Sequence, residues 1–123
     1  MGKIIIYSQQ IHTATLIAEV IADTADVEYC DTPEELIRHC IEHKPDLVII
    51  IAIAPFLNGS HIIRRIRFRG GRRPAIYVIA WHQSEHIVLS LLECGVDQYM
   101  TFPICMGRLQ SKINQFLQSN DTR

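Results

Sequence analysis

The sequence predicts an α/β fold, a doubly wound parallel sheet of five strands with helices on both faces. Two patterns alternate along the 123 residues: short apolar runs rich in β-branched residues, and longer segments whose apolar residues lie three and four apart. Three of the short runs are apolar on both faces, which is typical of parallel strands that helices cover on each side. Five such strand and helix units fit the flavodoxin-like strand order 2-1-3-4-5, with right-handed crossovers.

The short runs give the expected strands, which are Lys3–Tyr7, Val27–Cys30, Leu47–Ile53, Ala75–Ala80 and Gln98–Thr101. The longer segments give the expected helices, which are Ile11–Ala22, Pro33–His43, Ser60–Phe68, Ser84–Glu93 and Met106–Leu117. Thr32 is the expected N-cap of the second helix, with Pro33 at the first helical position and Glu35 three residues after the cap. Gly95 is expected to end the fourth helix in a left-handed conformation.

Helical periodicity also predicts which side chains pack on the sheet. The first helix is expected to use Leu16, Ile17, Val20 and Ile21. The last helix is expected to bury its apolar positions and to leave its polar positions outward. Its inward set is Leu109, Ile113, Phe116 and Leu117, and its outward set is Gln110, Lys112 and Gln115.

The composition is that of one compact domain, with 48% hydrophobic side chains, 20% charged side chains and a net charge of -1. Residues 1–118 are expected to form it, and residues 119–123 a polar tail or the start of a linker to an output domain. The four cysteines are scattered without a Cys-x-x-Cys pair, which favours reduced thiols and a cytoplasmic protein. The longest apolar run, Leu47–Leu57, contains Pro55 and is too short to cross a bilayer.

The spacing of proline and glycine residues around the third expected strand indicates a protein family more specifically than the fold does. Pro45 and Asp46 lead into it, Pro55 lies four residues after Ile51, and Gly59 lies eight residues after Ile51. This pattern resembles the receiver domain of two-component response regulators, of the CheY-like superfamily. In that family a phosphoacceptor Asp ends the third strand, with Pro at +4 and Gly at +8. The resemblance extends from residue 3 to about residue 117.

The resemblance implies that every catalytic position of the family is replaced. The magnesium-binding acidic pair falls on Ser8 and Gln9, the acceptor on Ile51, the strand-four Thr or Ser on Ile79, and the strand-five Lys on Phe102. Aspartyl phosphorylation needs a carboxylate nucleophile, a magnesium cage of hard oxygens and a neutralising cation. These residues supply none of the three, so we expect neither catalysis nor a cofactor or metal here. Ile51, Ile79 and Phe102 are expected to form an apolar plug instead.

The predicted function is a degenerate, non-catalytic receiver that signals by protein contact or dimerisation without phosphorylation. The resemblance implies a contact face built from the fourth helix, fifth strand and fifth helix, with Leu91, Leu92, Tyr99 and Ile104 as candidate contacts. Tyr99 stands at the family's aromatic switch position. A DNA-binding output domain after the last helix is common in that family.

Two other interpretations remain open. Six of the twelve basic residues lie between residues 64 and 73, where there is no acidic residue, and this cluster could bind nucleic acid directly. The cluster comprises Arg64, Arg65, Arg67, Arg69, Arg72 and Arg73. Two histidine pairs with helical spacing, His39 with His43 and His82 with His86, could share a metal, the second pair together with His12. Solvated surface residues are the simpler interpretation of both features.

Overall fold

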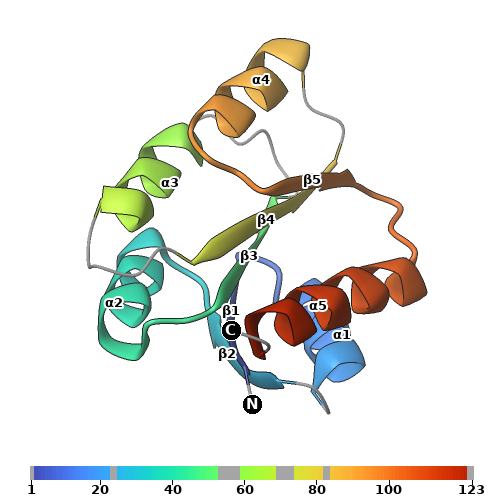
Figure 1. Ribbon diagram of the computed structural model, residues 1–123. Coiled ribbons are helices and arrows are strands. Elements are labelled where there is room, and N and C mark those ends of the chain that lie inside the picture. The colour runs from blue at the N-terminus through green and yellow to red at the C-terminus, as the bar shows by residue number, and fades with distance from the viewer. Residues whose placement is uncertain (1, 23–24, 53–58, 69–73, 82–83, 122–123) are drawn as a thin grey trace.

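The computed structural model describes residues 2–22, 25–52, 59–68, 74–81 and 84–121. Its five strands pair in parallel in the order β2-β1-β3-β4-β5, which confirms the predicted topology (Figure 1). The strands are β1 (Gly2–Ser8), β2 (Ala25–Cys30), β3 (Leu47–Ala52), β4 (Ala75–Ala80) and β5 (Gln98–Thr101). β1 and β2 begin earlier in the chain than predicted, at Gly2 and Ala25.

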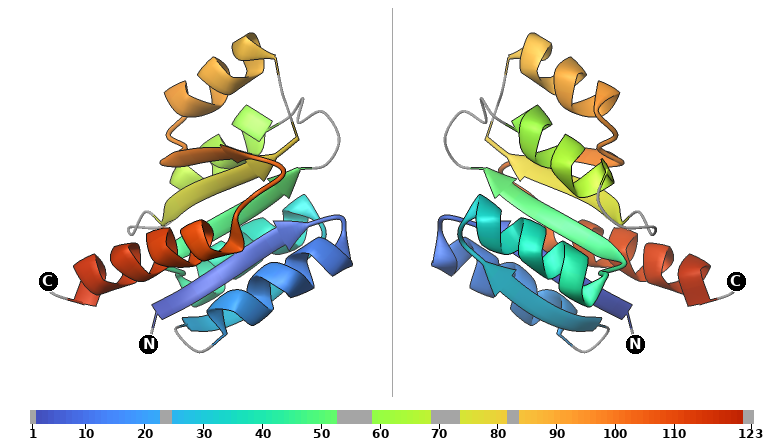
Figure 2. Two further views of the ribbon diagram at one scale, coloured as in Figure 1. Left: turned by 90° about the vertical axis from the view of Figure 1, so that its right-hand side faces the viewer. Right: turned by 90° about the vertical axis from the view of Figure 1, so that its left-hand side faces the viewer.

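Helices cover both faces of this sheet. They are α1 (Ile11–Ile21), α2 (Pro33–His43), α3 (Gly59–Phe68), α4 (Glu85–Glu93) and α5 (Met106–Asp121). Figure 2 shows α1 and α5 on one face and α2, α3 and α4 on the other. α5 continues past Leu117 to Asp121, into the segment expected to be a tail. No helix in the described ranges is both long and apolar enough to cross a membrane.

The predicted helix ends carry the predicted caps. The Thr32 side chain accepts a hydrogen bond from the Glu35 backbone N–H, and Pro33 occupies the first turn of α2. At the end of α4, Gly95 has a φ of 108°, which an L side chain rarely adopts. The Val96 N–H donates to the Leu91 carbonyl and the Gly95 N–H to the Leu92 carbonyl, which is a Schellman motif.

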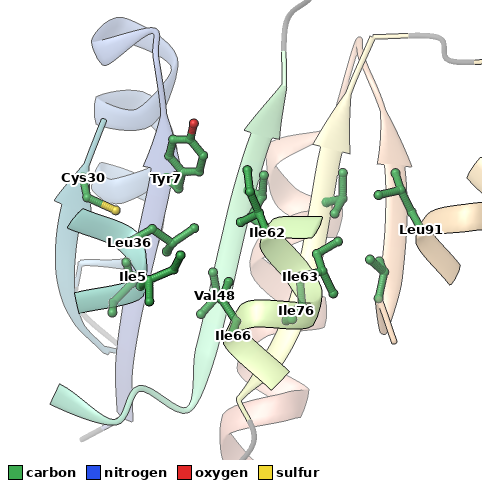
Figure 3. Packing of buried hydrophobic residues seen from close by; sticks show 14 of the residues in the cluster. Ile5, Tyr7, Cys30, Leu36, Val48, Ile62, Ile63, Ile66, Ile76 and Leu91 are labelled. Atoms are coloured by element: carbon green, nitrogen blue, oxygen red, sulfur yellow. The ribbon is translucent and has the colours of Figure 1, made fainter. Parts of the chain in front are cut away.

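The strands alternate their side chains between two apolar cores. Ile5, Val48 and Ile76 pack under α2, α3 and α4, as Figure 3 shows, whereas their neighbours Ile4 and Ile49 pack under α1 and α5. Complete burial of an aliphatic side chain contributes roughly 1.5–3 kcal/mol. Both faces of the central strands therefore stabilise the sheet.

Three predicted helix faces were wrong in detail. Leu16 is 55% exposed, because Ala14, Ile17 and Ile21 form the buried stripe of α1. Leu91 was predicted to be a surface contact but is 1% exposed and lies in the core beneath α4, visible in Figure 3. On α5, Gln110 was predicted to point outward, yet its Nε2 donates to the Val20 carbonyl of α1.

Candidate functional site

The carboxyl ends of neighbouring strands form a row at the edge where the family resemblance places its pocket. Ser8 in β1 is the Cα partner of Ile51 in β3, and Ile51 is the partner of Ile79 in β4. Met100 of β5 continues the row next to Ile79. Ile51 and Ile79 belong to the core under α1 and α5, and Phe102 packs against this same core. The fold thus gathers residues that are far apart in the sequence.

Most of this edge is dry and apolar. Ile51 is 5% exposed and Ile79 is fully buried, so neither position presents a polar group to solvent. Phe102 is half-buried and its ring lies 5.3 Å from the Trp81 ring, between centroids. Trp81 keeps half of its surface exposed, and the two rings contact each other at an interplanar angle of 37° just after the ends of β4 and β5.

The polar atoms at the end of β1 do not fit a magnesium site. Ser8 is completely buried, and its Oγ both accepts from the Gln10 N–H at 2.9 Å and donates to the Gln10 carbonyl at 3.1 Å. Gln9 is exposed. Magnesium sites in proteins use carboxylates as their anchors, and Ser8 and Gln9 offer only neutral oxygens. The hydroxyl of Ser8 closes a turn instead.

Tyr99 lies on the other side of the sheet from this row. It is the Cα partner of Val78 and is partly buried against the core under α4. The loops after β3 and β4, including Pro55 and His82, lie outside the described residues.

The face predicted to contact partner proteins, formed by α4, β5 and α5, exposes apolar side chains. Leu89 and Leu92 are the exposed leucines of α4, at 51% and 45%, while Ile104 is half-buried. Lys112 of α5 donates to the Gln98 side chain of β5, which ties these two elements together across the same face. Figure 1 shows α4, β5 and α5 in succession at one side of the molecule.

The described residues include the side chains of two arginines of the basic cluster, Arg64 and Arg65. Arg64 is exposed and Arg65 half-exposed on α3. The side chains of Arg67, Arg69, Arg72 and Arg73 lie outside the described residues.

A groove of about 960 Å³ lies between α1 and β2, which is an edge strand of the sheet. Ile11, Ala18, Val27 and Tyr29 are among its lining residues. None of the five positions predicted for the degenerate pocket lines it, so the row at the strand ends and this groove are separate features.

A cluster that the sequence analysis did not assemble lies between β2 and α2. Glu28 is grouped with His39 and His43, of which only the histidine pair was recognised. Burial raises the pKa of Glu28, but the hydrogen bond from His39 and the charges of His43, Lys3 and His39 lower it overall. The other histidines in view, His12 and His86, are exposed and belong to no such group among the described residues.

Comparisons with known proteins bear on this arrangement. No protein-family model matches the chain. It is 27% identical to the probable transcriptional regulatory protein SilR of Salmonella typhimurium over 121 residues, which is 98% of this chain and 53% of SilR. It is 26% identical over 96 residues to the alkaline phosphatase synthesis transcriptional regulatory protein PhoP of Bacillus subtilis, which is 78% of this chain and 40% of PhoP. The chain thus spans about half, or less, of these relatives.

Solved structures with a similar fold include response regulator receiver domains. A CheY-like response regulator receiver domain protein from Methanospirillum hungatei matches with a TM-score of 0.85 at 17% identity, over 99% of this chain and 98% of that chain. The sequence relatives carry the names of transcriptional regulators rather than of enzymes. The chain therefore has the fold of CheY-like response regulator receiver domains, and its sequence is similar to the amino acid sequences of transcriptional regulatory proteins.

Proposed function

We propose that this domain is a degenerate receiver that acts by protein contact and is not switched by phosphorylation. The observation that carries the proposal is the burial of Ile51 and Ile79 in one apolar core at the strand ends. A phosphoryl acceptor needs an accessible carboxylate beside a divalent cation. Ile51 supplies a hydrocarbon side chain that is shielded from water at the position where the family resemblance expects that carboxylate.

Asp46, the carboxylate directly before β3, is poorly placed to act as phosphoacceptor instead of Ile51. Asp46 precedes the strand at its amino end, and its Oδ2 accepts a hydrogen bond from the Lys3 backbone N–H at 2.9 Å. Asp46 N–H in turn donates to the Lys3 carbonyl, so Asp46 joins β1 and β3 at the edge away from Ile51. Because Asp46 is engaged in these backbone hydrogen bonds at the other end of β3, it is not expected to replace the missing phosphoacceptor.

The contact surface that we propose is the face formed by α4, β5 and α5. Leu89 and Leu92 of α4 expose apolar surface, and Tyr99 of β5 and Ile104, which precedes α5, are partly buried. Leu92 and Leu89 replace Leu91 as the apolar contacts, since Leu91 belongs to the core. We expect any self-association through this face to be modest, because α5 contributes polar side chains such as Lys112 to it.

For the whole protein, we propose the regulatory domain of a cytoplasmic, DNA-binding transcription regulator. The names of SilR and PhoP support a role in transcription, and each relative is longer than the segment matched here. The domain proper would comprise residues 1–118, with residues 119–123 leading to an output domain. In this arrangement DNA contact belongs to the output domain and the receiver sets how two copies meet.

Phosphodonor treatment tests the proposal directly. Purified protein is incubated with Mg²⁺ and acetyl phosphate, and its intact mass is measured under conditions that preserve acyl phosphates. We expect no adduct, whereas a phosphorylatable receiver domain treated in parallel shows that the donor is active. A labile adduct mapped to an Asp at the carboxyl edge of the sheet contradicts the proposal.

Direct nucleic-acid binding through the basic cluster is the alternative, and the exposure of Arg64 favours it. Phosphate contacts make such binding strongly salt-dependent. Fluorescence anisotropy with duplex DNA, at rising salt, separates the two functions. We expect no saturable binding by the isolated domain; binding that weakens with salt and that Arg64→Ala reduces would favour the alternative.

A further inference from the structure

A carboxylate of β2 and two imidazoles of α2 meet between these two elements, apart from the row of residues at the strand ends. The His39 Nδ1 donates to Glu28 Oε2 at 2.9 Å, and His43 Nδ1 lies 3.7 Å from Glu28 Oε1. The two imidazole rings are 5.3 Å apart between centroids. One ligand atom from each of the three side chains lies within 4.8 Å of the other two. Both histidines therefore present the same ring nitrogen to one carboxylate.

The fold brings this set together for simple reasons. Glu28 shares its side of β2 with Cys30, two residues on, which packs into the core under α2. α2 starts directly after β2, with Thr32 as its cap, and runs back along the strand. His39 and His43 are one turn apart and so occupy the same face of the helix. All three residues lie within regular elements, β2 and α2.

We propose that Glu28, His39 and His43 form a binding site for Zn²⁺. Carboxylate oxygen and imidazole nitrogen are both zinc ligands, and tetrahedral bonds of about 2.0–2.1 Å place ligand atoms about 3.3 Å apart. The two imidazole nitrogens lie 2.9 Å and 3.7 Å from the two different oxygens of Glu28, and one ligand atom of each residue lies within 4.8 Å of the others, so small side-chain shifts would reach this spacing. The side chains remain 20–36% exposed, so water can reach the metal and complete the fourth position. Bound zinc would tie α2 to the edge strand β2.

Lys3 of β1 supplies the competing positive charge at this site. Its Nζ lies 3.6 Å from Glu28 Oε1 and donates to His43 Nδ1 at 3.3 Å. The ammonium group thus contacts two of the three ligand atoms that zinc requires. Zinc has to displace it, so removing the ammonium should strengthen zinc binding while leaving all three ligands intact. A nonspecific association of zinc with surface histidines would not respond in this way.

Calorimetric titration of chelator-treated full-length chain with ZnCl₂ tests the site. The chain carries Cys105→Ser, because that cysteine is exposed and could bind zinc itself. We expect saturable one-to-one binding that excess Mg²⁺ does not prevent, since magnesium prefers oxygen ligands. His39→Ala and His43→Ala should each weaken it at least about tenfold, and Lys3→Met should tighten it.

His86→Ala is the matched control, since it removes an exposed histidine outside the cluster and should leave zinc affinity unchanged. Amide chemical shifts are measured in the protein that keeps Glu28, His39 and His43. This readout does not depend on whether the variants fold. We expect zinc-induced changes to concentrate around Glu28, His39 and His43. Absence of saturable binding, shift changes elsewhere, or equal affinities in His39→Ala, His43→Ala and the parent would overturn the proposal. So would unchanged affinity in Lys3→Met.

Discussion

Ile51 is the residue on which the proposed loss of switching depends, and its environment predicts the effect of restoring a carboxylate. It is 5% exposed within the core that also contains Ile79. Ile51→Asp would place an acidic group there without a cation or a designed hydrogen bond. We expect it to lower the free energy of unfolding by about 2–4 kcal/mol at pH 7.5, measured by urea denaturation.

Ile51→Val is the control for that experiment, because it only shortens the side chain and should cost about 0.5–1.5 kcal/mol. The two variants should also differ in pH dependence. Burial raises the pKa of the introduced carboxyl above its unfolded value of about 3.9. The folded state then holds a proton that the unfolded state has released, so Ile51→Asp loses stability as pH rises through this window. Equal stability of the Asp and Val variants would mean that the position is solvated.

The cysteines give a second prediction at this scale. Burial raises the pKa of both Cys30 and Cys40 to about 12, so on the order of 10⁻⁴ of each thiol is ionised at pH 8. Cys105 is exposed. We expect iodoacetamide at pH 8 to label Cys105 first and to reach Cys30 and Cys40 only in denaturant, as mapped by peptide mass spectrometry. Rapid labelling of Cys30 in the folded protein would contradict the burial argument.

Ionisation of the same thiols should also affect stability at alkaline pH. Their folded pKa values lie above those of an unfolded chain, so the folded state retains protons that the unfolded state loses. The stabilisation is complete below the unfolded pKa of about 8.5 and declines as pH rises toward 12. Urea denaturation between pH 8 and pH 10 should therefore show a falling free energy of unfolding. A Cys30→Ala variant should show a weaker decline.

At the scale of the element, two glycines should respond to alanine with opposite signs. Gly95 ends α4 with a φ of 108°, so Gly95→Ala should destabilise the domain by about 1–2 kcal/mol. Gly107 lies in the first turn of α5, where an added Cβ would have no neighbour within 4 Å. Gly107→Ala should stabilise by up to about 0.5 kcal/mol, because alanine favours helix but the first turn gains less than the helix interior. Thermal denaturation of both variants checks the pair, and the same sign for both would contradict it.

The helices also show where sequence periodicity stops being sufficient. The limits of α2 and its Thr32 cap were predicted because capping chemistry is local. The face of α4 was not, since Leu89, Leu91 and Leu92 are chemically alike and the turn geometry alone does not say which side meets the sheet. The side that buries Leu91 also buries part of Ile87 and Val88. That choice is made by packing against β4 and β5.

The cluster of Glu28, His39 and His43 shows the same limit for a site. Helical spacing indicated that the two histidines share a face, and this was recognised. Their carboxylate comes from a different element, so its contribution depends on which side of β2 faces α2. The usable signal was a charged residue between apolar ones in Val27–Cys30, on the same side as the buried Cys30. Sequence spacing alone could not supply the distance.

For the whole molecule, strand order was predictable because parallel strands buried on both faces admit few connections. The resemblance to receiver domains implied that Ile51 and Ile79 end neighbouring strands, and in the structure the two are Cα partners in β3 and β4. The turn that engages Ser8 was not predictable, because the same hydroxyl could have pointed toward the pocket. Its hydrogen bonds to Gln10 are a property of the folded backbone.

The behaviour of the whole domain in solution gives the last prediction. A receiver changes its population of two conformations only when a ligand binds one of them better, and a phosphoryl analogue has no anchor where Ile51 replaces the acceptor. Any association through α4, β5 and α5 should therefore be constitutive. We expect sedimentation velocity over a concentration series to give the same association constant with and without Mg²⁺ and beryllofluoride. Leu92→Glu should weaken any association, because it puts charge on exposed apolar surface.

The matched control is Leu16→Glu, which puts the same charge on the exposed side of α1 and should leave association unchanged. A beryllofluoride-dependent shift would mean that a phosphate-type switch survives, since only binding that differs between the two conformations can produce one.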